Sequence, residues 1–451
     1  MNYKQSVKIV IIGAGASGIA AATKLLKYGF QNVKILEAQS RIGGRIHTIP
    51  FGDNTLDLGA QWCHGEKGNV VFDLVKDMNI LDSTGRVFLD YECIRSNGEI
   101  ISNEITVKLK DIMNSIEDKE ELLKQYELSL EIALEFLEVY QKFSATYEGA
   151  QTIYDVSGKG YCEYTTCPGD SVLNWKHSGY ITLLNILMES KGKDFGKLSD
   201  RIKLNWPVSK IEWNNNFIKI LNSNGEYLEA DHIIFTGSLG VLKDNIDFLF
   251  EPRLPEINCK AIQGLGFGTY NKVFIQFSKK WWNDDFLGFA LHWRIKDLES
   301  LRKTEFSWLE NVVGFYIVRY QPNTLFSRVA GSSALFVETL SKAKQIEGMM
   351  YLLRTFLKNP DIPEPVDFII SSWNSNPYIK GSYSHRSMET EKMGTKASDL
   401  AQPVVGSDGK LKILFAGEAT HDHFYSTVHG AVESGWREAD RLNEYYTNES
   451  N

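Results

Sequence analysis

Residues 8–26 read KIVIIGAGASGIAAATKLL, and this stretch decides the fold of the chain. The run of branched apolar residues that ends at residue 12 predicts a strand buried on both faces, as in a parallel sheet. A glycine-rich turn follows, and the alanines and leucines after it predict a helix. Residues 33–36 read VKIL and predict a second strand, so the chain opens with a βαβ unit.

The three glycines of the turn have the spacing of a dinucleotide-binding loop. Gly13 allows a tight turn out of the strand, Gly15 lets a pyrophosphate approach the backbone, and Gly18 lets helix and strand pack closely. Ser17 lies in the same turn and belongs to the expected cofactor site. Glu37 follows the second strand, at the place where an acid binds the adenosine ribose.

A second glycine-rich segment, RIGGR at residues 41–45, comes soon after this unit. Two adjacent glycines bring the backbone close to a ligand, and Arg45 can neutralise a pyrophosphate charge. The two segments together predict FAD rather than NAD as the cofactor.

Charge and composition exclude several classes of protein. The 451 residues include 49 basic and 57 acidic side chains, a net charge of −8, without a basic block, which disfavours a nucleic-acid binder. Hydrophobic residues at 43% and charged residues at 24% are typical of a globular chain, not of a fibrous or disordered one. The uncharged run 9–23 is short for a membrane span and contains the glycine turn. We therefore expect a cytoplasmic protein with no membrane and no nucleic-acid partner.

Cysteine and histidine usage gives no sign of a disulfide framework or a metal site. Five scattered cysteines, an odd number, predict reduced thiols. The sequence HDH at 421–423 is typical of a polar loop, and we expect no metal.

The rest of the sequence predicts two domains that each draw on separate stretches. Amphipathic helices occupy 104–147, strands with an Asn-Gly hairpin turn occupy 206–235, and a strand and a helix close the chain at 412–445. The expected fold is α/β (mixed α+β): a discontinuous Rossmann-like FAD-binding domain and an inserted substrate-binding domain of sheet and helix. We place the FAD-binding domain at 1–85, 200–262 and 400–451, and the substrate-binding domain at 86–199 and 263–399.

Five further motifs lie along nearly the whole chain. They read GAQWCHG (59–65), GSLGVLK (237–243), LGFGTYNK (265–272), FAGEATH (415–421) and YSTVHGAVESG (425–435). With these motifs the chain resembles the flavin-dependent amine oxidases, in particular the polyamine oxidase and spermine oxidase group of animal type.

The resemblance implies a cofactor site built from several of these motifs. In the family, the motif at 415–421 holds the ribityl and phosphate part of FAD. The helix that begins near residue 430 aims its positive end at the flavin pyrimidine ring. The expected cofactor contacts in these later segments are those of Gly59, Ala60, Gln61, Val208, Gly417, Glu418, Thr427 and Val428.

It also implies which side chains surround the reacting atoms. The family's equivalent of Lys272 holds a water against flavin N5 and assists the reaction with oxygen. His64 is expected to hydrogen-bond the substrate amine or to keep it unprotonated. Trp62, Trp373 and Tyr383 are expected to be the aromatic residues that contact the substrate.

Two departures from monoamine oxidases bear on the cofactor and the substrate. Ser382 stands where those enzymes place the cysteine that bonds FAD, so we expect FAD to be held noncovalently. Thr427 replaces the second tyrosine of their aromatic cage.

Glu163 is a candidate to receive a distal ammonium of the substrate, and a solvated loop acid is an equally good interpretation. Thr166 stands where a second acid is typical of spermine oxidases, which leaves the preferred polyamine open.

These features predict FAD-dependent oxidation of a secondary amine in spermine or an N1-acetylated polyamine. The imine product hydrolyses to an aldehyde and a shorter amine, and oxygen is reduced to hydrogen peroxide. The alternatives are a histone-lysine demethylase of the same superfamily and a catalytically silent flavin-binding scaffold. The expected partners are the polyamine and oxygen, and a monomer or weak dimer is the expected assembly.

Overall fold

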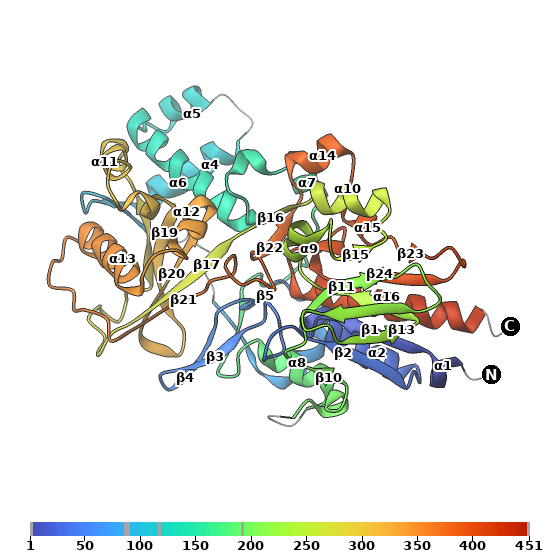
Figure 1. Ribbon diagram of the computed structural model, residues 1–451. Coiled ribbons are helices and arrows are strands. Elements are labelled where there is room, and N and C mark those ends of the chain that lie inside the picture. Colours follow the sequence, from blue (N-terminus) through green and yellow to red (C-terminus); the bar gives the residue numbers. More distant parts are fainter. Residues whose placement is uncertain (1–2, 85–90, 116–118, 191–193, 449–451) are drawn as a thin grey trace.

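The computed structural model describes residues 3–84, 91–115, 119–190 and 194–448. It has two halves, one around a mainly parallel sheet near both termini and one around a larger mainly antiparallel sheet (Figure 1). This mixed α/β architecture is the expected fold class.

The first half is organised by a six-stranded sheet. Its central strand β1 (Lys8–Ile12) pairs in parallel with β2 (Asn32–Leu36) on one side and with β14 (His232–Phe235) on the other. Beyond β14 lies β24 (Leu411–Phe415), also parallel, so strands some 400 residues apart in the sequence share one sheet. The edges of the sheet are β10 (Ile202–Lys203) and β23 (Val404–Val405).

Apolar residues fill both faces of this sheet, as the unbroken apolar run of β1 predicts. One face packs on helices α2 (Ala16–Lys27), α8 (Ile181–Met188) and α16 (Val428–Asn448). The other face packs on a four-stranded sheet and two helices. These elements are β11 (Val208–Glu212), β12 (Ile218–Asn222), β13 (Tyr227–Ala230), β15 (Phe250–Glu251), α9 (Leu239–Asn245) and α10 (Glu256–Gly264).

A seven-stranded sheet organises the second half. In spatial order its strands are β21 (Asp367–Ile370), β17 (Tyr270–Gln276), β20 (Gln321–Ala330), β19 (Val312–Val318), β18 (Gly288–His292), β7 (Glu92–Arg95) and β8 (Ile100–Ile101). One face packs on α11 (Ile295–Leu301), α12 (Gly331–Val337) and α13 (Lys342–Leu357). Val273 and Ile275 face these helices, while Phe274 lies on the opposite face. The side chains of β17 therefore alternate between the two faces of the sheet, which directs Lys272 away from the outer helices.

Further helices stand at one end of the seven-stranded sheet. They are α4 (Asn103–Asn114), α5 (Lys119–Gln125), α6 (Leu130–Glu148) and α7 (Gly158–Glu163). The longest, α6, begins after the cap Ser129 and ends at Gly149, whose φ of 70° stops the helix. Glu135 of α6 receives two hydrogen bonds from Arg95 of β7, which fixes the helix to the sheet.

Short elements complete the fold. They are α1 (Tyr3–Ser6), α3 (Val70–Val75), α14 (Met388–Met393), α15 (Ala397–Leu400), β3 (Thr48–Phe51), β4 (Asn54–Asp57), β5 (Trp62–Cys63), β6 (Leu81–Ser83), β9 (Leu173–Trp175), β16 (Gly266–Gly268) and β22 (Tyr383–His385).

The predicted domain boundaries can be compared with the sheets. The six- and four-stranded sheets draw only on 1–85, 200–262 and 400–451, and the seven-stranded sheet only on the other two stretches. Helix α8 falls within 86–199 but packs in one core with α2. The division into an FAD-binding and a substrate-binding domain stays a prediction.

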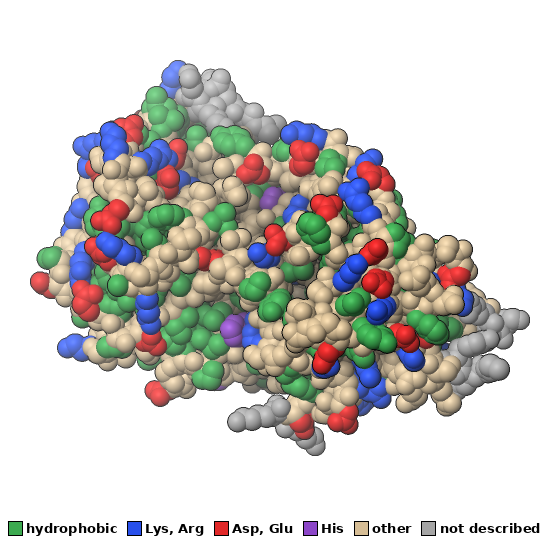
Figure 2. Space-filling model, viewed as in Figure 1, with side chains coloured by type: hydrophobic (Ala, Val, Ile, Leu, Met, Phe, Trp, Pro, Cys, Tyr) green, Lys and Arg blue, Asp and Glu red, His purple; other side chains and the backbone are tan. Residues whose placement is uncertain are grey.

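Surface charge, hydrophobic helices, metal-ligating side chains and cysteines can each be inspected in the structure. On the face shown in Figure 2, basic and acidic side chains are interspersed. In the part of the chain that the structure describes, no helix is both long enough and apolar enough to cross a membrane. Within the same residues, no three metal-ligating side chains come together as a metal site. All five cysteines have free thiols.

Candidate active site

A cavity of about 420 Å³ is lined by residues from both halves of the molecule. It contains most of the residues that the sequence points to: Gly13, Gly15, Ser17, Glu37, Arg45, Gly59, Ala60, Gln61, Trp62, His64, Val208, Lys272, Trp373, Tyr383, Gly417, Glu418, Thr427 and Val428. Gly18 and Glu163 do not line it.

In the glycine turn after β1, there is open space beside Gly15 and no space for a side chain at Gly18. A Cβ on Gly18 would lie 2.0 Å from the Gly13 carbonyl oxygen, so this glycine serves the packing of α2 on the turn. A Cβ on Gly15 would meet nothing closer than the Gly43 oxygen at 3.8 Å. The space beside Gly15, at the start of α2, is therefore open to a ligand phosphate.

Glu37 is held rigidly at the end of β2. Its carboxylate accepts hydrogen bonds from the backbone N–H of Ala14 at 2.8 Å and of Gln39 at 2.9 Å. Burial raises the pKa of Glu37, and these backbone donors oppose the increase. The backbone N–H of Trp206 donates to the backbone carbonyl of Glu37 at 2.9 Å, and Val208, two residues after Trp206, also lines the cavity.

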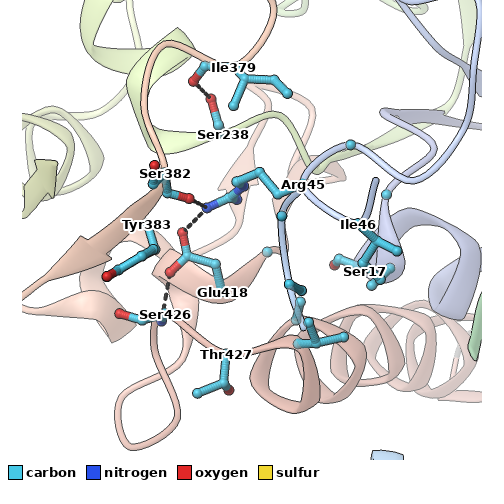
Figure 3. A pocket seen from close by; sticks show the side chains of 18 of the residues that line it. Ser17, Arg45, Ile46, Ser238, Ile379, Ser382, Tyr383, Glu418, Ser426 and Thr427 are labelled. Atoms are coloured by element: carbon cyan, nitrogen blue, oxygen red, sulfur yellow. Dashed lines mark hydrogen bonds and ion pairs between the residues drawn. The ribbon is translucent and has the colours of Figure 1, made fainter. Parts of the chain in front are cut away.

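Arg45 and Glu418 join the two ends of the chain across the cavity wall (Figure 3). Arg45 Nη1 lies 2.6 Å from Glu418 Oε1 and donates to the Ser382 carbonyl at 3.0 Å. Glu418 also accepts from the Ser426 N–H at 2.7 Å. Thr427 then caps α16, because its hydroxyl oxygen accepts from the Gly430 N–H at 3.0 Å.

The geometry at this end of the cavity fits FAD. The open cradle beside Gly15 has room for a pyrophosphate, and Glu37 is an acceptor for ribose hydroxyls. Val428, the first residue of α16, lines the cavity, so the positive end of a long helix borders the site. A side chain at residue 15 would fill the cradle.

Lys272 is buried at the other end of the site, with its side-chain amine held in place. Nζ donates to Gln61 Oε1 at 2.7 Å and to the Asp57 carbonyl at 3.0 Å, and it lies 5.2 Å from the ring centre of Trp62. Burial lowers the pKa of Lys272 below that of a free lysine; the Asp57 carboxylate opposes this and Arg328 adds to it. Lys272 is therefore a positioned donor that can lose its charge far more readily than a surface lysine.

The ring of His64 is oriented by a hydrogen bond of Nδ1, which leaves Nε2 available to a ligand in the cavity. Nδ1 lies 2.7 Å from the Ser171 carbonyl, which can only accept, so Nδ1 carries the proton. Burial lowers the pKa of His64, which favours the neutral ring with Nε2 as an acceptor. A second imidazole, His429, also lines the cavity, and burial lowers its pKa to about 3. Sequence reasoning did not single out His429, although it lies in the motif at 425–435.

The aromatic residues of the wall are fixed by contacts with neighbouring residues. The Tyr383 hydroxyl donates to the Thr146 carbonyl of α6 at 2.8 Å. Trp373 is buried and packs against Gly59, where a Cβ would come within 3.1 Å of its ring. The hydroxyl of Ser382 is engaged with the backbone of Tyr270, which it contacts as donor at 2.9 Å and as acceptor at 2.8 Å.

The structure does not bring Glu163 to the cavity. Its exposed carboxylate forms ion pairs with Arg386 and with Lys159, which corresponds to the loop-acid interpretation. A different acid, Glu148, lies at the end of α6 next to the cavity-lining Tyr147, and burial raises the Glu148 pKa to about 7. Among the described residues, no hydrogen bond or ion pair engages the Glu148 carboxylate.

Sequence reasoning also missed cavity residues on α6 and β20. Phe143, Thr146 and Tyr147 come from the helix, and Arg328 comes from the strand. Glu148 could have been noticed as an acid at the end of an amphipathic helix. Arg328 could have been noticed as a lone basic residue in an apolar strand.

Comparisons with known proteins agree with this site. The family model described as flavin containing amine oxidoreductase matches residues 16–443. The peroxisomal N(1)-acetyl-spermine/spermidine oxidase of Bos taurus is 30% identical, and the match covers 96% of this chain and 94% of that protein. Human lysine-specific histone demethylase 2 is 26% identical, with 96% of this chain and 53% of the demethylase covered.

A solved structure supports the fold. The cyclohexylamine oxidase from Brevibacterium oxydans superposes with a TM-score of 0.69 at 21% identity, and the match covers 98% of this chain and 99% of that one. The family match begins within the glycine turn and contains most of the residues that line the cavity, including Lys272. The chain therefore belongs to the flavin containing amine oxidoreductases, with FAD as its cofactor and a small-molecule amine as its substrate.

Proposed function

We propose that this chain oxidises a secondary amine within a polyamine, spermine or an N1-acetylated polyamine, with oxygen as the electron acceptor. One observation carries the proposal. A positioned Lys272 and a neutral, oriented His64 lie in the same cavity as an FAD cradle. The Bos taurus relative, by its name, acts on acetylated polyamines, which supports this substrate class.

FAD supplies the oxidising power of the reaction, since it accepts a hydride from the carbon beside the amine nitrogen. The substrate loses that hydride and the nitrogen proton and becomes an imine. Water hydrolyses the imine to an aldehyde and a shorter amine. Oxygen receives the two electrons together with two protons and leaves as hydrogen peroxide.

The side chains of the cavity have distinct roles in this proposal. A free alkylamine titrates near pH 10.4, so the substrate must lose a proton before it reacts. Nε2 of His64 is an acceptor that binds the amine and favours its neutral form. Lys272 places its donors at the reacting centre, and Trp62, Trp373 and Tyr383 exclude water around it.

Mixing the purified holoenzyme with amines under anaerobic conditions tests the proposal. Spermine or N1-acetylspermine should bleach the flavin absorbance, and benzylamine should not. After oxygen is admitted, one hydrogen peroxide should form per amine consumed. Bleaching by benzylamine alone would refute the substrate class, bleaching only by a methylated lysine peptide would favour the demethylase alternative, and no bleaching by any amine would favour a silent scaffold.

We further propose noncovalent FAD, because a serine hydroxyl at residue 382 cannot form a thioether, and the two-domain division given above. A cytoplasmic location is supported by five free thiols. A monomer or weak dimer is the proposed assembly. Sedimentation of the holoenzyme and imaging of a tagged chain in cells test the last two statements.

A further inference from the structure

Glu338 directly follows helix α12, and the proposed reaction assigns it no role. Its carboxylate accepts three hydrogen bonds from segments that are far apart in the sequence. Oε1 accepts from Asn271 Nδ2 at 2.8 Å and from the Asn374 backbone N–H at 3.0 Å, and Oε2 accepts from the Ser375 N–H at 2.6 Å. One side chain therefore links α12, strand β17 and the segment that follows β21.

Trp373 lies immediately before the two residues that donate their backbone N–H groups to Glu338. Its side chain is 5% exposed, lines the cavity and shares an apolar cluster with Leu58 and Phe274. The backbone N–H of Trp373 itself donates to Asn271 Oδ1 at 3.5 Å. Three consecutive peptide N–H groups are therefore anchored directly at the ring that forms part of the cavity wall.

Asn271 connects the same restraint to the strand that carries Lys272. Its side chain is fully buried and donates to a backbone carbonyl of α12 at 2.9 Å as well as to Glu338. The backbone N–H of Lys272 donates to the Ser371 hydroxyl at 2.8 Å, and the Ser371 N–H donates back to the Lys272 carbonyl at 2.9 Å. These contacts tie the segment with Trp373 to β17 through residues that do not line the cavity.

All three groups that donate to the Glu338 carboxylate are N–H groups. The two oxygens of a carboxylate only accept hydrogen bonds, so they can satisfy every one of these donors. The amide of a glutamine would instead turn its own NH2 toward a donor. The partners of residue 338 therefore require two acceptor oxygens, which only an acid supplies.

We propose that Glu338 is a positioning residue that fixes the Trp373 ring at the reacting centre from the side of α12. It acts through the backbone of Asn374 and Ser375 and does not itself line the cavity. This inference rests on the proposed function, in which Trp373 helps to exclude water around the amine. It adds the acid that holds the ring in place.

A purely structural role of Glu338 would have different consequences. If the carboxylate only stabilised the fold, its replacement would act equally whether or not an indole ring stands at residue 373. If it positions that ring, its effect on amine binding disappears when the ring is absent. A double-mutant cycle separates the two roles, because it measures the coupling between two residues and not the loss at either one.

The cycle consists of the wild-type holoenzyme, Glu338→Gln, Trp373→Leu and the double variant. Trp373→Leu keeps an apolar side chain in the wall and removes the ring. Glu347→Gln, which removes an acid paired with Lys344 on α13, is the matched control. Anaerobic stopped-flow mixing with spermine and with N1-acetylspermine gives the Kd of the amine, and reoxidation by oxygen is measured separately. FAD content and melting temperature are recorded for each protein.

We expect Glu338→Gln to raise the Kd of the amine at least fivefold where residue 373 is tryptophan and less than twofold where it is leucine. Reoxidation should change less than twofold, since Lys272 keeps its contacts with Gln61 and Asp57. Glu347→Gln should match the wild type. A Kd that rises by the same factor in both backgrounds, or does not change in Glu338→Gln, would overturn the inference.

Near-ultraviolet circular dichroism of the same proteins supplies a readout that needs no turnover. This spectrum depends on the surroundings of the tryptophan rings, so Glu338→Gln should change it where Trp373 is present and not in the Trp373→Leu background. The same spectral change in both backgrounds would overturn the inference. If no amine reduces the flavin of the wild type, the proposed function is refuted, and the spectra alone decide the role of Glu338.

Glu338→Asp takes the place of Glu338→Gln in the cycle if the glutamine variant does not retain FAD. Aspartate keeps both acceptor oxygens but is one methylene shorter, so its contacts with the loop are weakened. The Kd of the amine should rise about threefold with Trp373 and stay unchanged in the Trp373→Leu background. Equal factors in the two backgrounds would overturn the inference.

Discussion

Lys272 Nζ donates to Gln61 Oε1 at 2.7 Å, and Gln61 Nε2 in turn donates to Asn174 at 3.2 Å. Three segments far apart in the sequence therefore meet in one line of hydrogen bonds. A surface lysine would move through many rotamers, whereas burial and two hydrogen bonds restrict the side chain of Lys272.

Lys272→Met tests whether that position matters for the reaction with oxygen. The variant keeps the length of the side chain and removes its donors and charge. FAD should stay bound, because its phosphate and adenosine contacts lie elsewhere, and reoxidation of the reduced enzyme should slow about 100-fold. Stopped-flow traces of the two half-reactions measure this. Lys210→Met, at a partly exposed position of β11 where the lysine pairs with Glu251, is the control, and equal reoxidation rates in both variants would make Lys272 an ordinary strand lysine.

Gly15→Val should remove FAD without unfolding the apoprotein. The new Cβ does not clash with any protein atom, because the nearest one is the Gly43 oxygen at 3.8 Å. The branched side chain nevertheless occupies the cradle that the pyrophosphate needs. The flavin-to-protein absorbance ratio should fall below about one tenth of the wild-type value, while circular dichroism stays unchanged. Gly18→Val is the contrasting variant, because its Cβ collides with the Gly13 carbonyl and the fold itself should be destabilised. Full FAD occupancy in Gly15→Val would show that the pyrophosphate binds elsewhere.

Replacing Glu148 and replacing Glu163 should have different effects on the KM for a polyamine with a free distal ammonium. Glu148→Gln should raise the KM about fivefold, equivalent to roughly 1 kcal/mol. Because burial raises the Glu148 pKa to about 7, the wild-type KM should also rise as the pH falls below 7, and the variant should lose this dependence. Glu163→Gln breaks a surface pair with Arg386 and should leave the KM unchanged. The reverse ranking in steady-state assays would return the ammonium contact to Glu163.

His385 should make the protein less stable in acid. Burial lowers its pKa from 6.5 to about 4, so between these values the unfolded chain binds a proton that the folded protein does not. The free energy of unfolding therefore falls as the pH drops below 6.5, by about 2 kcal/mol at pH 5 from this group. Urea unfolding of wild type and His385→Gln at pH 7.5 and pH 5 measures the difference. An equal acid loss in both proteins would contradict the assignment.

Ser382 predicts how FAD leaves the denatured protein. Its hydroxyl is engaged with the Tyr270 backbone and has no sulfur with which to bond the flavin. Acid precipitation should leave all yellow colour in the supernatant as intact FAD, identified by mass. Flavin that remains in the washed pellet would contradict noncovalent binding.

The parts that were predictable from the sequence are those encoded by local patterns. The β1–α2–β2 unit follows from one buried strand and three glycines, and the hairpin between β12 and β13 follows from an Asn-Gly turn. The alternation along β17 predicts correctly that Lys272 lies on the opposite face from Val273.

The parts that were not predictable depend on which distant segment arrives beside a residue. Glu163 directly precedes Tyr164, which lines the cavity. The carboxylate of Glu163 nevertheless pairs outside the cavity with Arg386, which comes 223 positions later in the sequence. Arg328 looks like one more strand residue until the pairing of β20 with β17 places it opposite Lys272. Such juxtapositions are properties of topology, which periodicity does not encode.

The parallel sheet has a consequence for how the enzyme is made. β24 and α16 complete the sheet and the helical layer that β1 and α2 begin, and Gly435 packs on the Ser17 carbonyl. When only the first 400 residues have left the ribosome, the FAD site still lacks Gly417, Glu418, Thr427 and Val428, and β14 lacks its partner strand β24. The complete cofactor site can therefore form only after residues 411–431 have been made, and until then one edge of β14 is an unpaired strand edge.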